Sequence, residues 1–138
     1  MTEKQMTYFI PPEKAGQYLT LPFQMPADTA EFSLTYSYPA YSKTPTAVDG
    51  GLFTASKRLN IIDLGLIAPD GQQVGASGSD KASMTLSENR ATPGYTPTKL
   101  TPGEWRILVG AYKVAPEGVT VTYDLAFTPK QRRLLIGD

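Results

Sequence analysis

VTVTYDLAFT, residues 119–128, alternates large apolar side chains with small or polar ones without a break. Successive side chains of an extended strand point to opposite faces, so this stretch carries an apolar row on one face and a polar row on the other. EFSLTYSY, residues 31–38, alternates in the same way. Each stretch therefore predicts a β-strand with one face in a core and the other in solvent.

Two further stretches, residues 59–68 and 105–112, are apolar on both alternating faces. This pattern is typical of a central strand covered on both sides, and the β-branched content and flanking turns favour strand over buried helix. Trp105 alternates with apolar neighbours and is expected to anchor the core. Shorter strands are predicted at residues 18–23, 72–76 and 82–87.

The turn signals fit an antiparallel arrangement. Pro-Asp-Gly at residues 69–71 predicts a tight reversal, because proline fixes φ and glycine accepts positive φ. Pro-Glu-Gly at residues 116–118 predicts a hairpin between the strand from Trp105 and the strand from Val119. No segment has apolar spacing of three and four residues over helical length. The chain therefore predicts an all-β fold, an antiparallel β-sandwich that is jelly-roll-like.

Two long connections interrupt this pattern, at residues 39–57 and 87–100. The first is rich in Ser, Thr, Ala and Gly and could hold a short helix or be mobile. Loops of this length in a compact domain are commonly functional or flexible.

Composition excludes several classes of function. The 138 residues suit one domain, and 13 basic against 13 acidic side chains give no net charge, which argues against nucleic-acid binding. No apolar run approaches the length of a membrane helix, and the polar N-terminus lacks the apolar segment of a signal peptide. With no cysteine, the chain needs no oxidising compartment, so we expect it to be cytoplasmic.

The absence of histidine excludes a Ser-His-Asp triad and a Cys-His pair. The carboxylates open to catalysis are Glu31, Asp63, Glu104 and Asp124, and the sequence does not bring any two of them together. Asp63 stands out because its neighbours are apolar. A buried Asp must be paired or hydrogen-bonded, so we favour an Asp held by loop amides or by an arginine over a catalytic one.

Oxygen ligands for Ca²⁺ are present but scattered. No Asp-x-Asp or EF-hand-like spacing gathers them in one compact loop, and turn chemistry explains Asp70 equally well. The oxygen-bearing candidates are Asp63, Asp70, Asp80, Asn60 and Asn89. We therefore assign no metal site and no cofactor to this chain.

Tyrosines offer a different kind of site, since flat aromatic rings stack against sugars. Tyr36 and Tyr38 share a face with apolar residues and are expected in the core, whereas Tyr95 follows Pro93-Gly94 and is expected on a rigid turn that presents its ring. The candidate ligand or docking residues are Tyr95, Asp63 and Tyr41.

Several short motifs resemble one known domain. They are IIDLGL at residues 61–66, ATPGY at 91–95, PGEW at 102–105, GAYK at 110–113 and RRLLIGD at 132–138. In this order and spacing they resemble the non-catalytic β domain that precedes the metal-binding barrel in PHP-superfamily (polymerase and histidinol phosphatase) phosphoesterases.

The resemblance implies a sandwich domain over residues 1–131 and a linker strand over residues 132–138 that leads into a C-terminal catalytic domain. That barrel would hold divalent metal through His, Asp and Glu, and only Asp138 matches the beginning of its first metal motif. The resemblance thus implies a non-catalytic accessory or interaction domain whose partner is the barrel, and a severed linker strand or an uncovered sheet edge would permit homo-oligomerisation. The alternatives are a free-standing carbohydrate-binding β-sandwich module and, third, a small glycosidase with a carboxylate pair.

Overall fold

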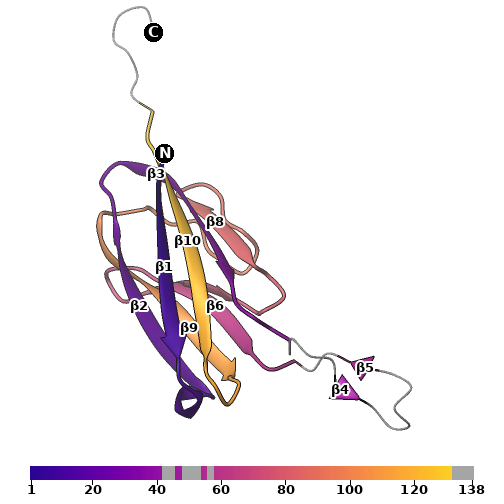
Figure 1. Ribbon diagram of the computed structural model, residues 1–138. Coiled ribbons are helices and arrows are strands. Elements are labelled where there is room, and N and C mark those ends of the chain that lie inside the picture. The colour runs from indigo at the N-terminus through magenta and orange to yellow at the C-terminus, as the bar shows by residue number, and fades with distance from the viewer. Residues whose placement is uncertain (42–45, 48–53, 56–57, 132–138) are drawn as a thin grey trace, which may run out of the picture.

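Two four-stranded antiparallel sheets pack face to face in the computed structural model, which describes residues 1–41, 46–47, 54–55 and 58–131 (Figure 1). The first sheet has the order β1-β10-β3-β8 and the second has the order β2-β9-β6-β7. The strands of the first sheet are β1 (Thr2–Ile10), β10 (Val119–Pro129), β3 (Thr29–Ser37) and β8 (Ser83–Ser87). Those of the second are β2 (Gln17–Met25), β9 (Gly103–Lys113), β6 (Ile61–Ile67) and β7 (Gln73–Ser77).

The strand pairs are nested, and this nesting defines a jelly roll. β1 pairs with β10, β2 with β9, β3 with β8, and β6 with β7. The chain thus resembles one long antiparallel hairpin, in which the first arm contains β1, β2, β3 and β6 and the returning arm contains β7, β8, β9 and β10. Further pairs, β10 with β3 and β6 with β9, roll that hairpin into two sheets. The predicted fold class, an antiparallel jelly-roll-like β-sandwich, is confirmed.

The predicted hairpin between the strands of Trp105 and Val119 is wrong. The turn itself forms, with the Gly118 amide donating to the Ala115 carbonyl at 2.8 Å and Gly118 at a φ of 83°. However, β9 and β10 belong to different sheets, so the turn carries the chain across the sandwich. A turn signal predicts a reversal of direction but does not say whether the next strand pairs with the last or packs opposite to it.

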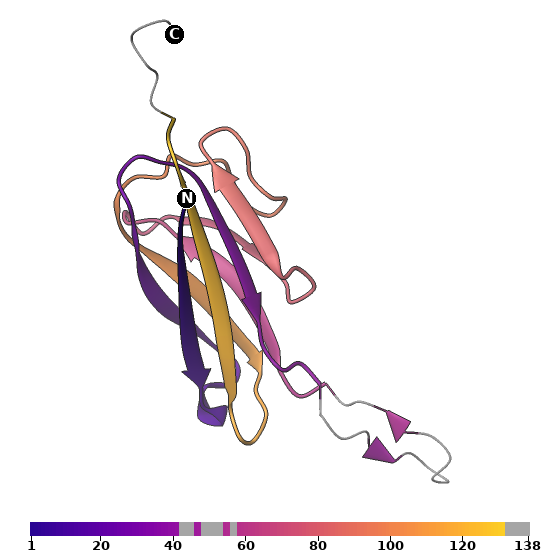
Figure 2. The same cartoon turned by 45° about the horizontal axis from the view of Figure 1, so that its top comes forward.

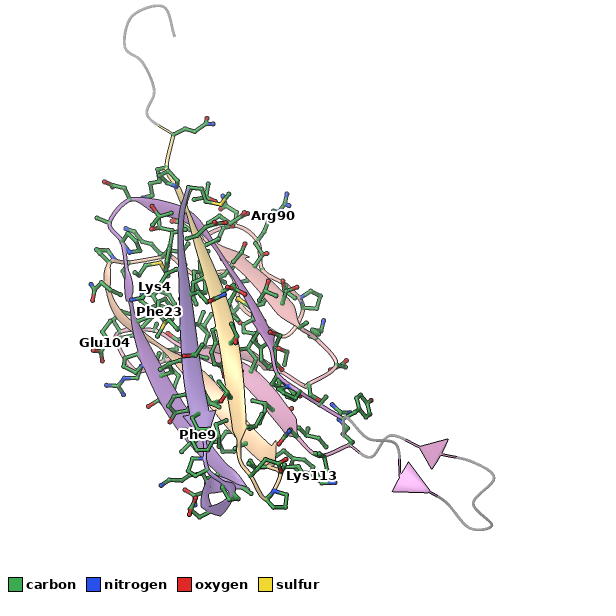
Figure 3. All side chains as sticks on the ribbon, in the orientation of Figure 1. Lys4, Phe9, Phe23, Arg90, Glu104 and Lys113 are labelled. Atoms are coloured by element: carbon green, nitrogen blue, oxygen red, sulfur yellow. The ribbon has the colours of Figure 1, made fainter. Side chains whose placement is uncertain are left out.

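The core lies between the sheets, where side chains fill the space (Figure 3). Alternate residues of the long strands contribute to it. In β10 the predicted apolar row is buried and the intervening residues are not, as the alternation predicts. Trp105 is fully buried, and its indole nitrogen donates to the Thr101 carbonyl at 2.8 Å. Aromatic rings from both sheets meet in the core: Phe23 of the second sheet stacks on Phe32 of the first, with centroids 5.2 Å apart.

β6 and β9 are central strands as predicted, but the prediction that both of their faces are covered is wrong. Their inward rows are buried, whereas on the outer face Tyr112 is 71% exposed and Leu108 is half-buried. Their outward positions are apolar or small because they form a surface of their own, described below, and not because another layer covers them.

The remaining predicted strands are present, as β2, β7 and β8. Residues 87–100 cross from β8 in the first sheet to β9 in the second, as expected of an irregular connection. Within residues 39–57, β4 (Thr46–Ala47) and β5 (Thr54–Ala55) pair antiparallel (Figure 2), and other residues of this stretch lie outside the described part, as does the predicted linker strand 132–138. The structure adds β1 and a short 3-10 turn, η1 (Pro12–Lys14), which the sequence patterns did not predict. None of the described helical residues forms a helix long and apolar enough to cross a membrane.

Two buried tyrosines stack at the centre of the core but differ in how their hydroxyls are satisfied. The rings of Tyr36 and Tyr123 lie 5.8 Å apart and nearly parallel. The Tyr36 hydroxyl donates to the Ile62 carbonyl at 2.6 Å, which ties β3 to β6 across the sandwich. The Tyr123 hydroxyl is buried and has no hydrogen-bond partner among the described residues. Burial raises the pKa of both phenols, so both are neutral at physiological pH.

We predict opposite effects for the same substitution at these two positions. Tyr36→Phe leaves the Ile62 carbonyl without its cross-sheet donor and should lower the free energy of unfolding by about 1–2 kcal/mol. Tyr123→Phe removes a buried hydroxyl that has no partner, so the stability should be unchanged or higher. Urea denaturation at pH 7 measures both, and equal losses in the two variants would contradict the assigned hydrogen bond.

Candidate functional site

The two outer faces of the sandwich differ in chemistry. On the first sheet the outward positions are mainly hydroxyl-bearing, and cross-strand rows such as Thr7-Thr122-Ser37 run over its surface. On the second sheet the outward positions include Tyr18, which is 73% exposed, and Tyr112. The outer face of the first sheet carries one exposed aromatic side chain, Phe9, which is 55% exposed. The second sheet carries two, both more exposed, and its outer face is therefore the candidate functional surface.

A single cross-strand row organises this surface. Tyr18 of β2 and Asp63 of β6 are both paired with Gly110 of β9, so the three residues lie side by side on one face. A Cβ placed on Gly110 would lie 3.3 Å from the Tyr18 ring and 3.0 Å from the Asp63 Cβ. The ring and the carboxylate stem therefore close over Gly110 from either side, an approach that is possible because residue 110 has no side chain.

A hollow of about 250 Å³ opens beside this row. We call it the Asp63 hollow, and its lining residues are Tyr18, Asp63, Leu64, Ala76, Ser77, Gly78, Leu108 and Gly110. A smaller hollow of about 60 Å³ continues on the other side of Tyr18 toward Tyr112, and Asp63 and Gly110 line it as well. Asp63 thus lines both hollows, one beside Tyr18 alone and one that Tyr112 borders as well.

The floor of the Asp63 hollow depends on a second glycine. Gly65 pairs with Leu108 of β9 on one side and with Ala76 of β7 on the other. A Cβ on Gly65 would come within 3.0 Å of two atoms of the Leu108 side chain. The glycine therefore lets Leu108 lie flat across the neighbouring strand, where it forms an apolar floor.

The charge of the hollow is negative. Asp63 contributes a carboxylate, and one oxygen of Asp80 lies 3.0 Å from the position of a Cβ on Gly78, at the rim. No Lys or Arg is among the described residues that line the hollow. The expectation that Asp63 is buried and held by loop amides or an arginine is wrong, since it faces outward and is only half-buried.

Tyr95 occupies a different place from the one its turn suggested. Its ring is only 7% exposed, so the expectation that the turn presents it to solvent is wrong. The backbone of Tyr95 bridges Gly75, and a Cβ on Gly75 would come 2.6 Å from the Tyr95 Cα. The hydroxyl exchanges a hydrogen bond with the Ser77 hydroxyl at 2.9 Å and donates to the Leu64 carbonyl at 3.4 Å. Tyr95 therefore pins the crossing loop against β7 and β6, immediately behind the hollow.

Tyr41, the third predicted site residue, is 54% exposed but lies in a separate cluster. The Arg58 guanidinium sits 5.9 Å from the centre of its ring and donates to the Ser79 hydroxyl at 2.8 Å. The Arg58 carbonyl accepts a hydrogen bond from the Lys113 ammonium at 2.8 Å, and Lys113 is visible near one end of the sandwich in Figure 3. The structure thus does not bring Tyr41, Asp63 and Tyr95 into one site.

The four candidate carboxylates do not form a catalytic pair. Glu104 lies about 20 Å along β9 from Gly110, the partner of Asp63, and bonds Arg106 at 3.4 Å. On the first sheet, Glu31 pairs with Thr128 of β10. Thr128 lies about 13 Å along β10 from Asp124, so Glu31 and Asp124 are also far apart. Both distances exceed the roughly 5–9.5 Å of glycosidase pairs.

The proposed calcium ligands are also dispersed. The side chain of Asn60 is buried; it donates a hydrogen bond to the Pro39 carbonyl and accepts one from the Ala115 amide. Asp70 accepts a hydrogen bond from the Gln72 amide, as is typical of a turn. The described residues contain no group of three or more Asp or Glu side chains placed to hold a metal ion. Asp138 lies outside the described residues.

Sequence reasoning missed Tyr18 and Tyr112. In β2, Tyr18 and Thr20 alternate with Leu19 and Leu21, so a period-two pattern with an outward tyrosine is visible in the sequence. What the sequence does not carry is the pairing that places Tyr18 opposite Gly110 and Asp63.

No protein-family model matches this chain, and no curated protein matches it either.

The role assigned to Tyr95 predicts a coupled loss of stability. Tyr95→Phe should lower the free energy of unfolding by about 1–2 kcal/mol, because it removes the partner of the Ser77 hydroxyl and the side-chain donor to the Leu64 carbonyl. Ser77→Ala should also destabilise, and the double variant should lose less than the sum of the two. Strictly additive losses in urea denaturation would show that the two hydroxyls are not bonded to each other.

Proposed function

We propose that this chain is a non-catalytic interaction domain that docks, through the outer face of its second sheet, onto the catalytic domain of a PHP-type metal-dependent phosphoesterase. The observation that carries the docking part is a pair of exposed tyrosines, Tyr18 beside the Asp63 hollow and Tyr112 beside the smaller hollow next to it, on a molecule whose other sheet face is hydroxyl-rich. Tyrosine is enriched at the centres of protein interfaces because it buries a large rigid ring and keeps a polar end.

The nature of the neighbour rests on the sequence motifs. IIDLGL and GAYK, which resemble the accessory domain of these enzymes, lie on β6 and β9 and contribute Asp63, Gly65, Gly110 and Tyr112 to the candidate surface. In this proposal the divalent metal and all catalysis belong to the neighbouring barrel, whose first metal motif would begin at Asp138. The assembly would reside in the cytoplasm, in keeping with the cysteine-free composition.

The proposal is tested first by the coding sequence that follows the Asp138 codon. We expect an open frame that continues into a His-x-His motif and a segment long enough for a barrel. A stop codon at that point would overturn the proposed parent enzyme.

Once the catalytic barrel has been produced as a separate domain, its association with this chain can be measured by calorimetry. Tyr18→Ser combined with Tyr112→Ser should weaken association by tenfold or more, since each removes an exposed ring from the interface. A matched change of two exposed residues on the other face, Thr35→Ala with Thr120→Ala, should leave it unchanged. Equal effects of the two double variants would place the interface elsewhere.

A second candidate function is carbohydrate binding by a free-standing module. The observation that favours it is a hollow lined by Asp63 and by both exposed tyrosines, Tyr18 and Tyr112, since aromatic faces and a nearby carboxylate are what a sugar ring and its hydroxyls need. Here we expect retention on immobilised polysaccharide that is lost in Tyr18→Ala and in Tyr112→Ala. Absence of retention on plant, fungal and bacterial polysaccharides would argue against this candidate.

A further inference from the structure

We propose that the Asp63 hollow is the receptor for the guanidinium end of an arginine side chain presented by the docking partner. This inference deepens the proposed interaction function and rests on it for the source of the arginine. The ligand chemistry itself follows from the walls, the charge and the size of the hollow.

One wall is an aromatic ring that is open to a ligand. The Tyr18 side chain is 73% exposed, yet its ring edge lies over Gly110, where a Cβ would be 3.3 Å away. A planar guanidinium stacks on such a ring and is attracted by its π face. The same ring lines the Asp63 hollow, and the hollow provides the room for the ion.

The opposite wall is a carboxylate. Asp63 projects from β6 and lines the same hollow, and the Asp80 carboxylate lies at the Gly78 rim. An arginine placed in the hollow could stack on Tyr18 and direct its N–H groups at the Asp63 oxygens, an arrangement that strengthens both contacts because guanidinium and carboxylate match in geometry and charge.

The basic side chains of this chain that lie nearest along β6 and β9 have other partners. Arg58 bonds Ser79 and covers Tyr41, Lys113 bonds the Arg58 carbonyl, and Arg106 pairs with Glu104. Among the described residues the one ion pair joins Arg106 to Glu104, so neither Asp63 nor Asp80 is paired with a described cation. Charge complementarity thus favours a cation from outside.

The size of the hollow suits one side chain. Its volume of about 250 Å³ is below the roughly 300–1,000 Å³ of sites for whole small molecules. Leu108 and Ala76 give it an apolar floor on which the methylene groups of an arginine can lie. A lysine ammonium would gain the charge but not the planar stacking, and a neutral sugar would gain the stacking but not the charge.

The test is an NMR titration of the isolated chain with Nα-acetyl-arginine amide, with Nα-acetyl-citrulline amide as the neutral, nearly isosteric control. We expect saturable amide shifts confined to β2, β9 and β6, with a dissociation constant in the millimolar range that rises with ionic strength. The citrulline probe should bind at least tenfold more weakly. Equal binding of the two probes, or shifts that do not saturate, would overturn the inference.

Three variants sharpen the test. Asp63→Asn, which keeps the shape and removes the charge, should weaken arginine binding at least tenfold, and so should Tyr18→Ala, which changes an exposed side chain. Gly110→Ala should also weaken binding, because its methyl group would crowd Asp63 and the Tyr18 ring and displace both walls of the hollow. Thr35→Ala on the opposite sheet is the control that should bind as the parent chain does. If Asp63→Asn binds arginine as the parent chain does, or if a neutral oligosaccharide occupies the hollow equally well in parent and variant, the guanidinium assignment is wrong.

The arginine titration and the association experiment test different proposals, and their negative results can be told apart. Association with the barrel but no arginine binding would overturn the present inference and leave the docking domain standing. Arginine binding without association would overturn the docking of this face on a barrel and leave the ligand chemistry of the hollow in place.

Discussion

The packing of alternate apolar side chains from two sheets against each other is the constraint on which the rest of this structure depends. Every long strand gives one row to the core, where Trp105, Tyr123 and Phe32 are fully buried. Once those rows are committed to the core, the other row of each strand must face outward, and its chemistry is free to differ between the two sheets. The functional surface is therefore built from the residues that the core does not use.

Polar groups inside the core set how the sheets and loops are positioned. The Tyr36 hydroxyl crosses the sandwich to the Ile62 carbonyl, and the Tyr38 hydroxyl accepts from the Ile62 amide at 3.0 Å. Both contacts hold β6, the strand that carries Asp63, from behind. Tyr95 and Ser77 do the same from the side of β7. Buried hydrogen bonds are directional, so they restrict β6 more narrowly than apolar contacts would.

The shape of the candidate surface depends on two glycines, Gly65 and Gly110, which have no side chains. Without side chains at Gly65 and Gly110, Leu108 lies flat and Tyr18 reaches toward β6. Both glycines sit in central strands, where glycine weakens a sheet and commonly marks a place of close approach. In this chain the close approach is made by Leu108 and Tyr18, and it leaves an open, negatively charged hollow on an otherwise ordinary sheet face.

The sequence by itself determined the strands with strong alternation, the all-β class and the position of most turns, because side-chain direction in a strand is set locally by a period of two. It did not reveal β1, whose inward residues Met6, Tyr8 and Ile10 are separated by polar ones near a polar N-terminus. Only the tertiary structure decided that β9 and β10 lie in different sheets, that Tyr95 points into the core, and that Tyr18 stands beside Asp63. These are outcomes of strand pairing between residues far apart in the chain, and pairing depends on how both sheets bury their apolar rows together, which no local pattern contains.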